Sequence, residues 1–234
     1  MAHHHQPPSQ PQLLGIPGLS LAGPKTWAVS EEARAQGKRG EEKTANVLAQ
    51  LLVPGGPTVL HSLRMPVSGV DADIDHLVVA GSHVWVFDTK AWKSAFYWTL
   101  AGRTRRGFRR IAFADRHTAE MAVDALNNLF VRQGLHAVVH KPYIVIWPSS
   151  QRKPVNIAFY RPRGAKAVHG EVLDTRLAKI ASGGPADPDI VTALYPLLST
   201  ARLAAAQVRD GRLHDTGTHL RPMRDDRRGV LDEF

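Results

Sequence analysis

Two short apolar segments, at residues 74–80 and 84–89, stand out in the hydrophobic pattern because each carries charged residues near one end. Branched and aromatic residues dominate both segments, and a turn at residues 80–83 separates them, a combination that predicts a β-hairpin. A buried strand holds few charged side chains, because removing a charge from water is costly unless a partner compensates it. The pattern therefore indicates a hairpin at which charged groups meet.

Strand alternation decides which of these charged side chains meet. Successive side chains of a strand point to opposite faces, so Asp88 and Lys90 share one face with Val84 and Val86. Across the turn, the hairpin brings Asp75 of the first strand near Asp88. We therefore expect two carboxylates and one ammonium group to converge.

This trio has a chemical interpretation and a structural one. Two close carboxylates repel each other unless a cation lies between them, and hard oxygen ligands select Mg²⁺ or Mn²⁺. A lysine beside such an ion orients or deprotonates an attacking water and offsets charge that develops on a phosphate. The structural alternative is a salt bridge at a strand end. An acid-x-Lys tripeptide does not decide between them, because residues 41–43 have the same pattern.

Hydrophobic periodicity and turn residues predict the remaining elements. Ser30 is a good N-cap for a first helix that continues to residue 52, although Gly37 and Gly40 favour a later start. We expect further helices over residues 117–132, 171–181 and 187–208, and a loop over residues 151–164. Strands are expected over residues 58–65, 96–100, 137–147 and 167–169, the third of them interrupted by Pro142.

Glu41 lies on the apolar side of the first helix, four residues before Ala45 and seven before Leu48. An inward-facing acid in the first turn has two interpretations. It interacts favourably with the helix dipole, or it is a third carboxylate of the predicted site.

Composition narrows the class of protein. The chain has 234 residues and no cysteine, which excludes disulfides and thiolate metal sites and fits a reducing, cytoplasmic location. No apolar run approaches the ~20 residues of a membrane span, and the first residues are too rich in His, Pro and Gln for a secretory signal. We expect a soluble protein.

The formal net charge of +9 favours a polyanionic partner, although charge alone does not separate DNA from RNA. Basic residues gather after residue 102 around Phe108, in a second predicted hairpin. Either this hairpin is a solvated basic turn, or it clamps a nucleic acid, with phosphates on the arginines and a base on Phe108. The basic charge of the chain favours nucleic-acid contact by Arg103, Arg105, Arg106, Phe108, Arg109 and Arg110.

The two ends of the chain lack hydrophobic periodicity. We expect disordered tails at residues 1–25 and 210–234 and one domain over residues 26–209. The histidines at positions 3–5 are interpreted as a tag remnant or a solvated run. The His-x-x-x-His spacing at residues 136–140 overlaps a predicted strand and not a helix, so a zinc catalytic site is not expected.

The order of these motifs resembles the NERD, or nuclease-related, domain, a branch of the PD-(D/E)XK nuclease superfamily. The resemblance covers residues 30–205 and is carried by Gly40-Glu41 in the first helix, Ile74-Asp75-His76 in the strand, Phe87-Asp88-Thr89-Lys90 followed by Ala91-Trp92, the strand at residues 142–147, and Val168-His169-Gly170 before a helix.

The resemblance implies an α/β fold with a restriction-endonuclease-like mixed central sheet flanked by helices. It also implies that Asp75, Asp88 and the main-chain carbonyl of Thr89 hold the metal, that Lys90 serves the water and the scissile phosphate, and that Glu41 is a further acid. The sequence departs from the family twice. The family often has Glu at the position of Asp88, and commonly has Gln in the helix after the hairpin, where this sequence offers Glu120 as a helper.

The resemblance therefore implies a DNA nuclease that depends on Mg²⁺ or Mn²⁺. Two alternatives remain open. One is a non-cleaving nucleic-acid-binding or regulatory module on the same fold, because fold alone does not determine activity. The other is a structural ion-pair cluster in an unrelated basic protein. The sequence does not indicate strand preference, cleavage position or oligomeric state.

Overall fold

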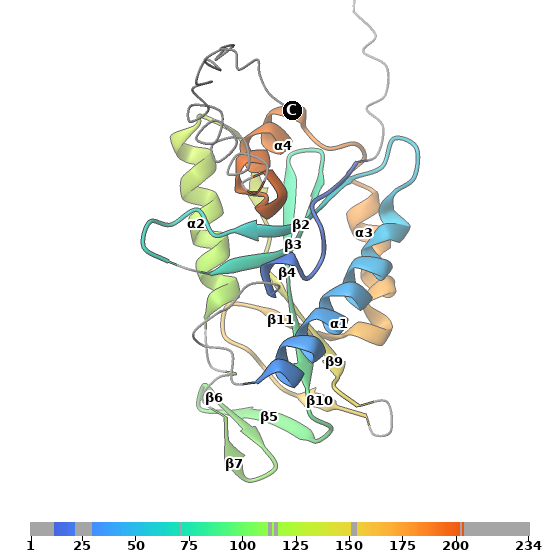
Figure 1. Cartoon of the computed structure of the whole chain (residues 1–234), viewed down its shortest axis with the longest axis vertical. Helices are drawn as coiled ribbons and strands as arrows, with labels where there is room; N and C mark the ends of the chain where they lie inside the picture. The colour runs from blue at the N-terminus through green and yellow to red at the C-terminus, as the bar shows by residue number, and fades with distance from the viewer. Residues whose placement is uncertain are drawn as a thin grey trace, which may run out of the picture. The chain divides into compact units, whose positions relative to one another are not determined.

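A mixed sheet of seven strands lies at the centre of the fold (Figure 1). The computed structural model describes residues 12–21, 30–70, 72–111, 114, 117–150, 154–201 and 203. The strand order is β1-β2-β3-β4-β9-β11, and β8 also pairs with β4. The strands are β1 (Leu13–Leu14), β2 (Thr58–Arg64), β3 (Asp73–Ala80), β4 (His83–Trp92), β8 (Val138–Val139), β9 (Tyr143–Pro148) and β11 (Lys166–His169).

Antiparallel and parallel pairing meet at β4. The predicted hairpin is present, because β3 and β4 pair antiparallel from His76↔Phe87 to Ala80↔His83. On its other side β4 pairs in parallel with β9, which pairs in parallel with β11. Because β4 has neighbours on both sides, its central part is buried and apolar.

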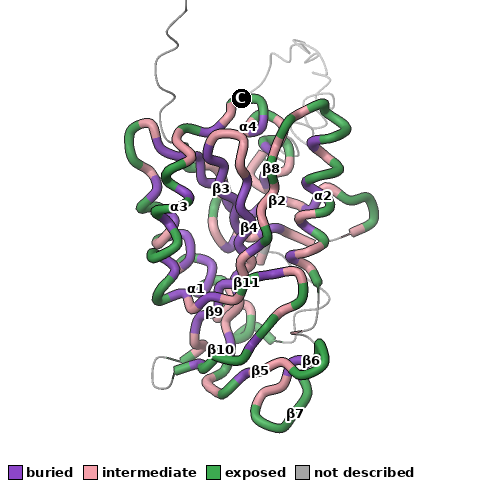
Figure 2. Tube along the Cα trace, turned by 180° about the vertical axis from the view of Figure 1, so that it is seen from behind, coloured by how far each residue is buried: buried purple, intermediate pink, exposed green. Residues whose placement is uncertain are grey.

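Helices cover both faces of this sheet. On one face, α1 (Glu31–Leu48) and α3 (Leu177–Ala181) pack against Trp85 and Phe87 of β4. On the other face, α2 (Thr118–Arg132) and α4 (Pro188–Leu194) pack against Val84 and Val86. Figure 2 shows the same two layers from behind, with buried strands between half-exposed helices. The fold is therefore the mixed α/β class that the sequence predicts.

A second, smaller sheet lies beyond the end of β4 (Figure 1). Its strand order is β10-β5-β6-β7, formed by β10 (Asn156–Phe159), β5 (Phe96–Leu100), β6 (Arg103–Arg106) and β7 (Arg109–Arg110). Trp92, the last residue of β4, stacks on Tyr97 of β5 with ring centroids 4.5 Å apart and contacts Tyr160 edge-on at 5.1 Å. These rings belong to a separate buried cluster that also includes Ile144 and Ile146 of β9, so the small sheet packs against the large one.

The first helix begins where the capping residue predicts. Ser30 is its N-cap, and the Ser30 Oγ accepts a 3.1 Å hydrogen bond from the amide of Ala33. The helix runs through Gly37 and Gly40, so the later start that these glycines favour is wrong. Burial of Thr44, Ala45 and Leu48 explains this outcome, because packing of one apolar face outweighs the helix propensity of single residues.

The expected disorder of residues 1–25 is wrong for residues 12–21. Leu13 and Leu14 form β1, which pairs in parallel with Val59 and Leu60 of β2 at the sheet edge, and a 3₁₀ turn, η1 (Leu19–Leu21), follows. The Ser62 hydroxyl donates a 2.7 Å hydrogen bond to the carbonyl of Ile16. The other residues of this predicted tail, including the histidines at 3–5, lie outside the described residues, as does the predicted tail at 210–234.

The interruption at Pro142 predicted for the strand at 137–147 is confirmed: β8 and β9 lie on either side of this proline, which lacks the amide hydrogen that a ladder requires. Two further element predictions need correction. The loop predicted at 151–164 contains β10. The helix predicted at 171–181 opens as a 3₁₀ helix, η4 (Gly170–Arg176), before α3.

The last predicted helix, at 187–208, is interrupted. Asp187 caps α4 as expected, with its carboxylate accepting from the amides of Asp189 and Ile190. After α4 the chain forms a 3₁₀ turn, η5 (Tyr195–Leu197), because Pro196 cannot continue the helical hydrogen bonds. Helical structure resumes at residues 199–201, and the rest of the predicted helix lies outside the described residues except for residue 203. Among the described residues, no helix has the length and apolar character needed to cross a membrane.

Candidate active site

The candidate site lies where β3 and β4 separate. Their pairing ends at His76↔Phe87, one residue before Asp75 and Asp88. Beyond that point β3 continues beside β2, while β4 continues beside β9 (Figure 1). There the amide of Thr89 is beyond the backbone ladder with β3, and it donates a 2.7 Å hydrogen bond to the side-chain Oδ2 of Asp75 instead. The structure thus brings Asp75 against the part of β4 that carries Asp88 and Lys90.

Asp88 and Lys90 contact each other on one face of β4. The Lys90 Nζ lies 2.7 Å from each Asp88 carboxylate oxygen, so both oxygens share one ammonium group. The Asp88 side chain is 13% exposed and that of Lys90 is 37% exposed. The pair lies at the rim of the core, where solvent reaches the lysine.

Glu41 enters the site from α1. It is only 4% exposed. Its Oε2 accepts a 2.9 Å hydrogen bond from the amide of Gly18, in the segment before α1. The preceding residue, Gly40, allows the helix to approach β4, since a Cβ there would lie 3.3 Å from Cγ2 of Thr89. Glu41 therefore faces the sheet, as the helical pattern predicts.

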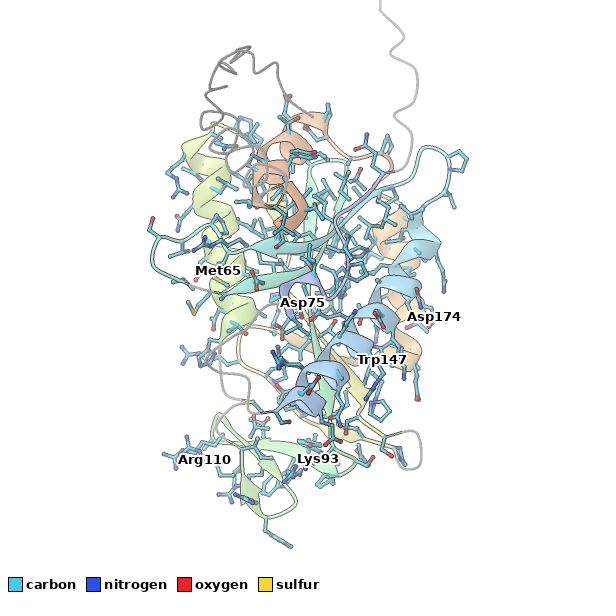
Figure 3. The ribbon with its side chains drawn as sticks, viewed as in Figure 1. Met65, Asp75, Lys93, Arg110, Trp147 and Asp174 are labelled. Carbon is cyan, nitrogen blue, oxygen red and sulfur yellow. The ribbon has the colours of Figure 1, made fainter. Side chains whose placement is uncertain are left out.

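Thr44 holds α1, β4 and β9 together beside these acids. Its Oγ1 donates to the carbonyl of Gly40 at 3.2 Å and accepts from Thr89 Oγ1 and Trp147 Nε1, each at 2.9 Å. Figure 3 shows Trp147 beside α1 and Asp75 in the middle of the fold. Nothing in the sequence linked Thr44, Gly18 or Trp147 to the site, because these contacts join distant parts of the chain.

Electrostatic interactions couple these four groups. Burial, together with the charge of Asp75, raises the pKa of Glu41 to about 9. Burial and the charge of Asp88 raise the pKa of Asp75 to about 7. Burial lowers the pKa of Lys90, but Asp88 and Asp75 raise it more, so the lysine stays an ammonium group. Without a further cation, Glu41 therefore keeps its proton at neutral pH and Asp75 is only partly ionised.

The donor set fits a divalent metal ion of the hard class. Carboxylates whose ionised forms are disfavoured gain from a nearby cation, and their oxygens suit Mg²⁺ or Mn²⁺. Among the described residues, no group of three His, Asp or Glu side chains has a metal-holding arrangement. An ion here would therefore use Asp75 and Asp88 together with main-chain and water oxygens, and Lys90 would have to release at least one Asp88 oxygen.

The proposed helper, Glu120, is not brought into this cluster. Its carboxylate lies 3.3 Å from Nδ1 of His117 and packs against Gly164. It lines a small pocket with Arg161 and Arg163, on the side of β9 that also bears Ile144. The raised pKa values of Glu41 and Asp75 have no contribution from Glu120.

The basic residues around Phe108 form the β6–β7 hairpin of the small sheet. Phe108 lies at its tip and is 96% exposed. Arg105 pairs with Arg110 and Arg106 with Arg109 across the hairpin. Such like-charged neighbours repel each other, which makes an anionic partner favourable.

Comparison with known proteins places part of the chain in a family. Residues 36–147 match the family model of NERD, the nuclease-related domain, which confirms the family indicated by the sequence motifs. The matched segment contains Glu41, Asp75, Asp88 and Lys90. No curated protein and no solved structure gives a significant match.

Proposed function

Because residues 36–147 belong to the nuclease-related domain family, we propose that this chain is a metal-dependent nuclease that hydrolyses phosphodiester bonds in DNA. One observation carries the proposal. Asp75 hydrogen-bonds to Thr89, between Asp88 and Lys90, so two acids and a lysine from different strands occupy one half-buried place. An ion pair that served only stability would not require a second and a third acid with raised pKa values.

Asp75 and Asp88 would hold Mg²⁺ or Mn²⁺, with the main-chain carbonyl of Thr89 as a further oxygen donor and Glu41 as a nearby acid. The bound ion would supply Lewis-acid charge to the phosphate and promote ionisation of a water. The chain itself supplies the positions of the donors. Thr89 fixes the Asp75 carboxylate through its amide, and Gly18 fixes that of Glu41.

Lys90 provides positive charge in this site. Since its pKa is raised, it acts as an ammonium group that attracts the phosphate and offsets charge developing on it, rather than as a base. Its partial exposure leaves the ammonium accessible to a phosphate from solvent. The arginines of the β6–β7 hairpin would neutralise further phosphates, giving sequence-independent, salt-sensitive binding.

Asp88→Asn tests the proposal. It removes one anionic metal ligand while keeping size and hydrogen bonding, so cleavage of plasmid DNA should fall at least about 100-fold, the upper end for the loss of a metal's supporting group. The rise in melting temperature caused by Mn²⁺ should also shrink. Asp174→Asn is the matched control, because Asp174 is exposed on η4 and hydrogen-bonds only locally to Thr175.

A non-cleaving binding module is the second candidate. The observation in its favour is that Lys90 occupies both oxygens of Asp88, which neutralises that acid without a metal. A wild type that binds DNA but neither cleaves it nor gains stability with Mg²⁺ or Mn²⁺ would establish this alternative and exclude the nuclease.

A further inference from the structure

The small sheet has one face that packs on the protein and one that does not. Tyr97 of β5 is 1% exposed and packs on Trp92 in the buried cluster shared with β9. By strand alternation its neighbours Phe96 and Trp98 point to the opposite face. Phe96 is 41% exposed there, and Leu100, on the same face, is 56% exposed.

The neighbouring strands extend this outer face on both sides. Trp98 pairs with Arg105, Leu100 with Arg103, and Arg105 with Arg110, so the three arginines share its side. On the other side Phe159 of β10, 65% exposed, meets Phe96 edge-on with ring centroids 6.1 Å apart. We call this surface the aromatic-arginine face; it comprises Phe96, Trp98, Leu100, Arg103, Arg105, Arg110 and Phe159.

The side chains at the centre of this face are held in place. The Trp98 Nε1 donates a 2.7 Å hydrogen bond to the carbonyl of Gly107, which sets the orientation of the indole. The Arg105 guanidinium lies 5.6 Å from the centre of the Trp98 ring and donates a 3.1 Å hydrogen bond to the carbonyl of Phe108. A ligand that stacks here would meet planar groups that already have fixed positions.

The aromatic-arginine face lowers the stability of the unbound protein. Arginines directly opposite each other repel, and exposed aromatic rings lose the benefit of burial. A ligand that offsets both costs needs negative charge and flat apolar surfaces at short intervals. Unpaired nucleotides have both, because each carries a phosphate and a base.

We propose that the aromatic-arginine face binds single-stranded nucleic acid, with bases stacked on Phe96, Phe159 and the Trp98–Arg105 pair and phosphates on the remaining arginines. A duplex offers its phosphates but keeps its bases stacked inside, so it would use only the arginines. This inference rests on the proposed nuclease function, and it adds that the substrate is single-stranded.

The small sheet follows directly on the strand of the candidate active site. Lys93 lies beside the small sheet in Figure 3, three residues after Lys90 on the same stretch of chain. The stacking of Trp92 on Tyr97 fixes this connection. A single strand that continued from the face along this connection would reach the part of β4 that carries Asp88 and Lys90.

Fluorescence anisotropy with the full chain in EDTA tests the inference without cleavage. The probes are a labelled oligothymidylate of about 12 nucleotides, a size typical of single-strand sites, a duplex of the same length, and an oligonucleotide whose bases are replaced by abasic sites. The wild type should bind the oligothymidylate at least about tenfold more tightly than the abasic strand, since stacking of one base is worth about 1–3 kcal/mol and about 1.4 kcal/mol is tenfold.

The variant F96A/F159A should lose most of this difference and keep its affinity for the abasic strand and the duplex. Tyr195→Ala is the matched control, because Tyr195 is an aromatic residue 53% exposed on η5, outside the small sheet. Equal wild-type affinity for the oligothymidylate and the abasic strand would overturn the inference even if the double variant failed to fold.

Cleavage assays with Mg²⁺ on the same preparations separate the two proposals. Metal-dependent cleavage without a preference for bases would keep the nuclease and reject the single-strand face. A base-dependent preference for single strands in a protein that never cleaves would keep the face and reject the nuclease.

Discussion

The amide nitrogen of Thr89 donates a 2.7 Å hydrogen bond to Oδ2 of Asp75 at the point where β3 leaves β4. Asp75 thereby replaces the backbone acceptor that a continuing β3 strand would have provided. The same carboxylate also interacts with the charges of Asp88 and Lys90. The Asp75 side chain thus forms the hydrogen bond that follows the last β3–β4 backbone pair, and it also contributes to the candidate active site.

This double role predicts different outcomes for Asp75→Asn and Asp75→Ala. The asparagine oxygen still accepts from Thr89, so at pH 8 the metal-free variant should be at least as stable as the wild type, whose ionised Asp75 is disfavoured. The alanine leaves that amide without its partner, which costs about 1–3 kcal/mol. Both variants should lose cleavage. Urea denaturation in EDTA measures the difference, and equal losses of stability would contradict the structural role.

Lys90→Ala should separate metal binding from catalysis. Removing the ammonium group frees both Asp88 oxygens and leaves the acids without their cation, so the metal-free variant should be less stable and should gain more stability from Mn²⁺ than the wild type does. Cleavage should fall about 100-fold or more. The exposed Lys179 of α3, outside the candidate site and the small sheet, supplies the control variant, Lys179→Ala. Reduced stabilisation by Mn²⁺ in Lys90→Ala would show that the lysine supports the metal site instead.

Glu41→Gln should change how stability depends on pH. The folded chain retains the Glu41 proton up to about pH 9, whereas the unfolded chain releases it near the ordinary value of 4.5. Between these values the folded state binds the extra proton, so the wild type loses stability as the pH rises, by at most about 1.4 kcal/mol per pH unit for this group. The glutamine has no such titration. Its stability advantage in EDTA should therefore grow from pH 5 to pH 9, and parallel pH profiles would refute the raised pKa.

Gly170→Ala should strongly destabilise the fold. A Cβ at this position would overlap the Trp147 ring, whose Nε1 donates to Thr44. Overpacking of this kind costs about 1–3 kcal/mol or more. Gly40→Ala gives the comparison, because its added methyl would only crowd Thr89 Cγ2 at 3.3 Å and alanine favours the helix by about 1 kcal/mol. Thermal melting should rank Gly170→Ala far below Gly40→Ala, and similar melting temperatures would show that Trp147 can move aside.

Local pattern in the sequence determined the elements that build the candidate active site. Strand alternation alone predicts that Asp88 and Lys90 share a face, and the structure has their side chains in direct contact. The helical stripe predicts that Glu41 faces inward, and Ser30 predicts where α1 begins. These features were predictable because each depends on residues within a turn or two of one another.

Only the tertiary structure decided which distant segments meet. No local pattern indicates that the amide of Gly18 donates to the Glu41 carboxylate, that β10 pairs with β5 in the small sheet, or that Phe159 extends the face formed by Phe96. The segment after Asp187 likewise carries a continuous apolar pattern, yet Pro196 interrupts its helix. Such contacts depend on the shape and hydrogen-bonding groups that the rest of the folded chain presents, which short-range periodicity does not encode.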